Sequence, residues 1–89
     1  MNAEQRENLR VALLRVLEAN NTRFGLGVPA LRHLLPTFGF GGVAEETVRD
    51  EIDYLVRKEL VVEVLKVVSR ENRCWRITEV GIGFLDARS

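Results

Sequence analysis

Residues 43–61, Val-Ala-Glu-Glu-Thr-Val-Arg-Asp-Glu-Ile-Asp-Tyr-Leu-Val-Arg-Lys-Glu-Leu-Val, carry the most regular pattern in this chain of 89 residues. Their apolar side chains recur at helical spacing: Val48, Ile52, Leu55 and Val56. This spacing predicts an amphipathic helix over residues 44–58. Glu45 and Glu46 lie in the first turn of this expected helix, and Arg57 and Lys58 lie in its last turn. This charge distribution is the one that the helix dipole favours.

Two further helices are expected before this segment. Residues 3–19 show one apolar stripe formed by Leu9, Leu13, Val16 and Leu17. Val11 and Leu14 lie off that stripe, so this helix should contact structure on more than one side. Residues 29–35 predict a short helix that begins at Pro29, bears Leu31, Leu34 and Leu35 on its buried face, and ends before Pro36.

A β-hairpin is expected after the central helix. Residues 60–68 are rich in valine, residues 73–78 alternate, and the polar residues 69–72 resemble a turn. Alternation places Trp75 and Ile77 on the inner face and Arg76 on the outer face. Residues 79–87 are predicted to form a closing helix, although two glycines weaken that prediction.

The order helix, helix, helix, strand, strand, tail indicates one α+β domain over residues 1–89. Residues 43–61 resemble the recognition helix and following strand of winged-helix transcription regulators. Residues 77–85, Ile-Thr-Glu-Val-Gly-Ile-Gly-Phe-Leu, are similar to the Leu-Thr-x-x-Gly-x-x-x-Leu tail that follows the wing in many of them. The resemblance implies a winged helix, that is, a three-helix helix-turn-helix bundle with a two- or three-stranded β-wing and a short C-terminal helical tail.

The same resemblance implies a small DNA-binding transcriptional regulator that acts as a homodimer on double-stranded DNA. Its third helix would enter the major groove with these exposed positions: Ala44, Glu45, Thr47, Arg49, Asp50 and Asp53. Thr47 and Arg49 are the expected base contacts, and Lys58, Arg70 and Arg73 the expected phosphate contacts.

Several residues depart from this pattern and support an alternative. Residues 44–53 contain five acidic residues and one basic residue, and such a surface repels phosphates. Ala44 replaces the usual polar cap, and Glu59 stands where glycine is usual before Leu60. The alternative is a protein–protein interaction module whose acidic third helix meets a basic partner without binding DNA. For Arg49, the alternative to a base contact is an intrahelical ion pair, such as one with Asp53 four residues later.

Composition argues against several other classes. The net charge is zero, so a nucleic-acid interface would have to be a local patch, such as the basic residues of the hairpin. One cysteine and one histidine supply no disulfide, zinc-site spacing or Cys–His dyad. Exposed helix carboxylates lack the burial that tunes catalytic acids. We therefore expect no enzyme, no metal and no cofactor.

The apolar residues of the sequence also bear on the location and the assembly of the protein. The polar N-terminus lacks a secretory signal pattern and no apolar run is long enough for a membrane span, which favours a cytoplasmic protein. Val11, Leu14, Ile82 and Phe84 provide more apolar surface than a three-helix core needs, which favours a homodimer. Phe38 and Phe40 either complete the core or contact a partner.

Overall fold

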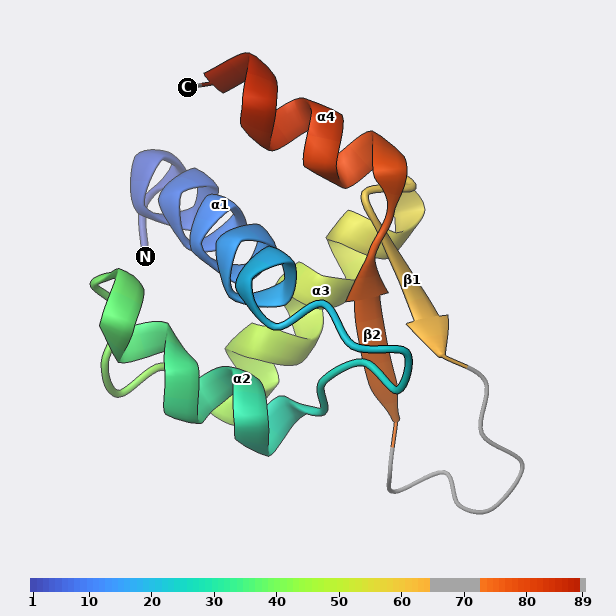
Figure 1. Ribbon diagram of the computed structural model, residues 1–89. Helices are drawn as coiled ribbons and strands as arrows, with labels where there is room; N and C mark the ends of the chain where they lie inside the picture. Colours follow the sequence, from blue (N-terminus) through green and yellow to red (C-terminus); the bar gives the residue numbers. More distant parts are fainter. Residues whose placement is uncertain (65–72, 89) are drawn as a thin grey trace.

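The computed structural model describes residues 1–64 and 73–88, and the predicted contact Arg70 lies outside them. Within these residues the chain forms four α-helices, a 3₁₀ helix and a two-stranded antiparallel sheet (Figure 1). The elements are α1 (Ala3–Ala19), α2 (Val28–Leu34), η1 (Leu35–Phe38), α3 (Glu45–Arg57), β1 (Val61–Val64), β2 (Cys74–Ile77) and α4 (Glu79–Arg88). This α+β arrangement is compatible with a winged helix.

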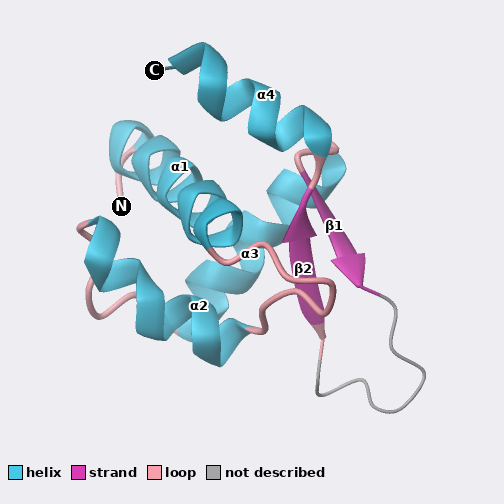
Figure 2. Cartoon of the chain, viewed as in Figure 1, coloured by secondary structure: helices cyan, strands magenta, loops and turns pink. Residues whose placement is uncertain are grey.

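Helix α1 is the centre of the packing. A capping box fixes its start, because the Asn2 side chain accepts from the Gln5 backbone N–H and the Gln5 side chain accepts from that of Asn2. The helix contacts α2, α3, α4, η1 and β2 (Figure 2). Leu14, which lies off the main stripe, is therefore fully buried like Leu13. The prediction that α1 meets structure on more than one side is confirmed.

The second helix differs from its prediction at both ends. It begins at Val28, so Pro29 is its second residue, and it ends at Leu34. Pro36 does not end the helical path, because the chain tightens into η1 and reaches a left-handed cap at Gly39, whose φ is 92°. A proline is compatible with the first turn of such a short helix because its missing N–H would be unpaired there. Phe38 and Phe40 pack half-buried against the core, which confirms the first of their two interpretations.

The sheet pairs Val61 with Ile77 and Glu63 with Trp75 in antiparallel register. Trp75 and Ile77 are buried as predicted, whereas Arg76 is half-buried. Leu26, in the loop before α2, forms an antiparallel bridge to Trp75, with reciprocal N–H···O=C bonds of 2.9 Å. Gly25 makes this approach possible, because its φ of 70° and the nearby Trp75 carbonyl leave no room for a side chain. The two-stranded sheet, here also called the ribbon, is thus extended by a third backbone segment at Leu26.

The tail forms the predicted closing helix, α4. Thr78 precedes it, and the Thr78 hydroxyl accepts from the Gly81 N–H and donates to the Glu59 carbonyl. The Thr78 N–H also donates to the Leu60 carbonyl. These bonds connect the start of α4 to the chain that leaves α3. Leu85 then packs in the core, and α4 lies along α1 in Figure 1.

Helix α3 ends in a Schellman motif. The Leu60 N–H donates to the Leu55 carbonyl and the Glu59 N–H to the Val56 carbonyl, each at 3.0 Å. This motif requires a left-handed residue after the cap. Here that residue is Glu59, with a φ of 63°, and it is the non-glycine residue with positive φ in the described chain. Glu59 therefore adopts the left-handed conformation that usually favours glycine at this position.

Glu59→Gly is expected to stabilise the protein by about 0.5–1 kcal/mol, because a left-handed residue with a Cβ carries a steric cost that glycine avoids. Urea denaturation measures the change. Glu59→Ala is the control, since alanine removes the carboxylate but retains the Cβ. An equal gain in Glu59→Ala would assign the effect to charge and contradict the conformational explanation.

No helix in residues 1–64 and 73–88 combines the length and apolarity that crossing a membrane requires.

Candidate functional site

The solvent-exposed side of α3 carries a row of carboxylates. Val48, Ile52 and Leu55 bury one face of the helix. On the opposite side are three exposed acidic residues, spaced four and three apart: Glu46, Asp50 and Asp53. This spacing aligns them on one face, and we call them the acidic stripe. None of the three forms an ion pair with another residue of the described chain.

A further acidic residue of α3 has a structural role. Glu51 is 6% exposed and faces α1. One carboxylate oxygen lies 2.5 Å from Arg10 Nε and the other 3.4 Å from Arg6 Nε. The Arg10 guanidinium also lies 3.6 Å from the centroid of the Tyr54 ring. Glu51 is therefore not one of the surface acids expected in residues 44–53, and its spacing from Val48, Ile52 and Leu55 places it on the buried face of α3.

The two predicted base contacts lie in different surroundings. Thr47 is half-buried and lines a hollow with Met1 and Gln5 at the start of α1. Arg49 is exposed and forms a 2.8 Å ion pair with Glu45, one turn earlier. The expected intrahelical pair is therefore present, but its partner is Glu45 and not Asp53. Glu45 and Asp53 each lie four residues from Arg49, so helical spacing alone does not predict which of them forms the ion pair.

The guanidinium of Arg73 is engaged by the opposite strand. Its Nε and Nη2 donate to the two carboxylate oxygens of Glu63 at 3.0 and 2.9 Å. It lies 5.1 Å from the Trp75 ring centroid. Hydrogen bonding to Glu63 raises the pKa of Arg73, and the charge of Asp53 adds to this effect. Arg73 is thus paired on the protein and lies within electrostatic range of the acidic stripe.

The Glu63 pair makes a pH-dependent contribution to stability. The hydrogen bond from Arg73 holds the pKa of Glu63 below its ordinary value of 4.5. A carboxyl group whose pKa is lower in the folded state stabilises the fold at pH values above its unfolded-state pKa. This stabilisation is lost as the pH falls through the folded-state pKa. The difference in stability between wild type and Glu63→Gln should therefore shrink below pH 4.5.

Urea midpoints measured from neutral pH down to acid test this expectation. In an Arg73→Met background, Glu63→Gln should cause no pH-dependent difference, because the partner is absent. If the wild-type difference stayed constant across the acid range, the ion pair would have no role in stability.

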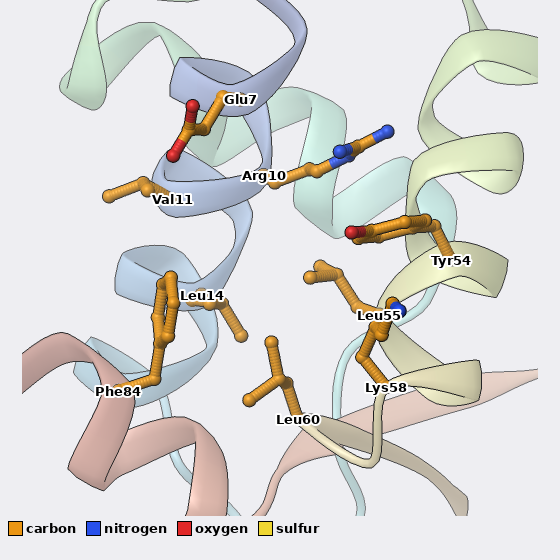
Figure 3. Close-up of a pocket in the computed structure, with 9 residues that line it drawn as sticks. All are labelled: Glu7, Arg10, Val11, Leu14, Tyr54, Leu55, Lys58, Leu60 and Phe84. Atoms are coloured by element: carbon orange, nitrogen blue, oxygen red, sulfur yellow. The ribbon is translucent and has the colours of Figure 1, made fainter.

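Lys58, the remaining described candidate, lies away from the stripe. It is the C-cap of α3, and its ammonium nitrogen lies 5.7 Å from the Tyr54 ring centroid. It also lines a pocket between α1, α3 and α4 (Figure 3). The structure therefore does not gather Thr47, Arg49, Lys58 and Arg73 as free groups on one face.

Metal-ligating residues are dispersed in the part of the chain that is described. No group of three or more His, Cys, Asp or Glu side chains there is placed to hold a metal ion. His33 is exposed on α2, and Cys74 is half-buried in β2.

Comparisons with known proteins assign no family to this arrangement. No protein-family model matches the chain, and no curated protein matches it.

Proposed function

We propose that the chain is a winged-helix domain that binds a basic protein surface through the acidic stripe of α3. The observation that carries this proposal is a difference in pairing. The three carboxylates of the stripe have no ion-pair partner among residues 1–64 and 73–88, whereas Arg49 and Arg73 are both paired with carboxylates. Arg57, four residues after Asp53 on the same face, adds one positive charge, so three carboxylates and one guanidinium leave this face with a net negative charge.

A negative face favours a cationic partner over a nucleic acid. Phosphate contacts supply most non-specific DNA affinity, and each requires an available cation. Glu46, Asp50 and Asp53 lie within two turns of helix, so their fields add over distances below the Debye length, about 8 Å at physiological salt. A lysine- or arginine-rich surface would gain from this field through faster association.

Three backbone features support the winged-helix assignment within this proposal. The helices precede an antiparallel ribbon, and Leu26 adds a third segment to it. Thr78 and Gly81, both part of the tail motif, connect α4 to the end of α3. The end of the first resembling segment and the start of the second are thus in direct contact, through Glu59, Leu60 and Thr78.

DNA binding as a homodimeric transcriptional regulator is the second candidate. Its support is that the charge of Asp53 raises the pKa of Arg73, so a carboxylate of the exposed face of α3 and the guanidinium beside β2 interact electrostatically. For this function Arg73 would give up its pair with Glu63 to bind a phosphate. Arg49 would give up its pair with Glu45 to contact a base. Thr47, Arg49, Lys58, Arg70 and Arg73 remain the predicted contacts.

One anisotropy experiment separates the two candidates. Labelled oligolysine and labelled random duplex DNA are each titrated with protein at low and physiological salt. We expect binding to oligolysine that Glu46→Lys/Asp50→Lys abolishes, and no binding to DNA. The matched control is Glu4→Lys/Glu18→Lys, which makes the same charge change on the exposed side of α1.

The opposite pattern would overturn the first candidate. Duplex binding at low salt with a steep salt dependence, weakened by Arg70→Ala/Arg73→Ala, would establish the DNA function. Oligolysine binding that both double variants retain would exclude the acidic stripe as its site.

A further inference from the structure

A pocket of about 440 Å³ opens between α1, α3 and α4. Figure 3 shows the side chains around it, which come from all three helices and from the residue before β1: Glu7, Arg10, Val11, Leu14, Tyr54, Leu55, Lys58, Leu60 and Phe84. Its volume lies in the range of roughly 300–1,000 Å³ that is typical of small-molecule sites. It lies on a different face of α3 from the acidic stripe.

The interior of the pocket is apolar. Leu14 and Leu55 are fully buried core residues, so the floor is held by the packing of α1 on α3. Val11 and Leu60 are half-buried walls, and Phe84 is 37% exposed. An apolar group placed here would remove these surfaces from water, and each buried methylene contributes about 0.8 kcal/mol.

The rim carries one charge without a counter-ion. Arg10 is paired with Glu51, and Glu7 lies 3.5 Å from Arg88. Lys58 has no ion pair with any residue in 1–64 or 73–88. The Tyr54 hydroxyl points toward the middle of the pocket (Figure 3). The uncompensated charge beside the apolar floor is therefore positive, with a hydroxyl donor next to it.

We propose that this pocket binds a small organic anion with a compact apolar body, such as an aromatic carboxylate. The ring would pack on Leu14, Leu55 and Phe84, and the carboxylate would accept from Lys58 Nζ and the Tyr54 hydroxyl. Charge complementarity selects the anion, because a cation would be repelled by Lys58 and a neutral molecule would gain no ion pair with it. The proposal is independent of what α3 binds.

The test is an NMR titration of the ¹⁵N-labelled protein with 2-naphthoate. Its neutral analogue 2-naphthamide and the cation 2-naphthylmethylammonium serve as matched probes. Shifts should gather at Val11, Leu14, Leu55, Leu60 and Phe84, with naphthoate binding most tightly. Lys58→Met should weaken naphthoate roughly tenfold, the effect of losing one charge-assisted hydrogen bond, and leave naphthamide unchanged.

Two further variants make the result decisive. Arg57→Met, a neighbouring exposed cation outside the pocket, should leave naphthoate affinity unchanged, and Val11→Phe should fill the pocket and reduce the affinity of all three probes. Equal affinity for the three probes, or naphthoate binding indifferent to Lys58→Met, would overturn the proposal. Absence of shifts together with a dimer that Phe84→Asp dissociates would also overturn it, because the occupant would then be a second copy of the chain.

Discussion

Gly81→Ala is expected to lower the free energy of unfolding by about 3 kcal/mol, at the upper end of the usual cost of overpacking. A Cβ at this position would overlap the Leu60 carbonyl oxygen and lie 2.7 Å from Ile77 Cγ1. The first obstacle is backbone, held by the bond from Thr78, so it does not yield by a change of rotamer. The start of α4 would have to move away from the ribbon, and Leu85 would lose part of its packing.

Chemical denaturation of Gly81→Ala beside Gly83→Ala measures this effect. Both glycines lie in α4, but a Cβ at Gly83 meets nothing within 4 Å. Gly83→Ala should therefore gain about 0.5–1 kcal/mol, the ordinary benefit of alanine in a helix. Equal effects in the two variants would show that the contact with Leu60 does not restrict the position of α4.

Glu51→Gln should destabilise the fold by about 2–3 kcal/mol. Glutamine keeps the shape but leaves Arg10 half-buried without a countercharge, and breaking fully buried pairs costs about 3–5 kcal/mol. We expect a smaller loss because the Arg10 and Arg6 side chains are 23% and 53% exposed. For a domain of this size the melting temperature should fall by roughly 10 °C or more.

Differential scanning calorimetry of Glu51→Gln and Glu46→Gln compares the stability lost at a buried and at an exposed carboxylate of α3. Both variants remove one carboxylate from α3, but Glu46 is exposed and unpaired in the described chain, so its substitution should change stability by less than about 0.5 kcal/mol. A double-mutant cycle with Arg10→Met assigns the loss to the ion pair. If Glu51→Gln were as mild as Glu46→Gln, the bridge between α1 and α3 would contribute nothing.

Periodicity predicted the helices well, and local chemistry predicted their ends less well. Helix α1 spans the predicted residues 3–19, because its apolar stripe and flanking polar residues agree. Helix α3 is one residue shorter at each end, since Ala44 and Lys58 are its caps. The tail helix formed despite its glycines because Gly81 permits close contact with Leu60 and Thr78 caps the first turn. Such tertiary compensation is not visible in helix propensity.

The charges of the candidate site were predictable in number but not in arrangement. The acidic stripe follows from helical spacing alone. The pair between Arg73 and Glu63 depends on strand register, which places Arg73, just before β2, within reach of Glu63 on β1, and no local pattern indicates it. The orientation of Thr47 toward Met1 and Gln5 likewise depends on how α1 crosses α3. These long-range relations pair Arg73 on the protein and place Thr47 beside the start of α1, and neither follows from local sequence.

The packing of α1 against α4 has a consequence during synthesis. Leu14 belongs to the first helix, and the surface around it is completed by α4, which contains Phe84 and Leu85. While a ribosome is still translating the two strands, α1 would expose the apolar surface that packs against α4 in the folded domain. The native core can therefore close only after residue 85 has left the exit tunnel.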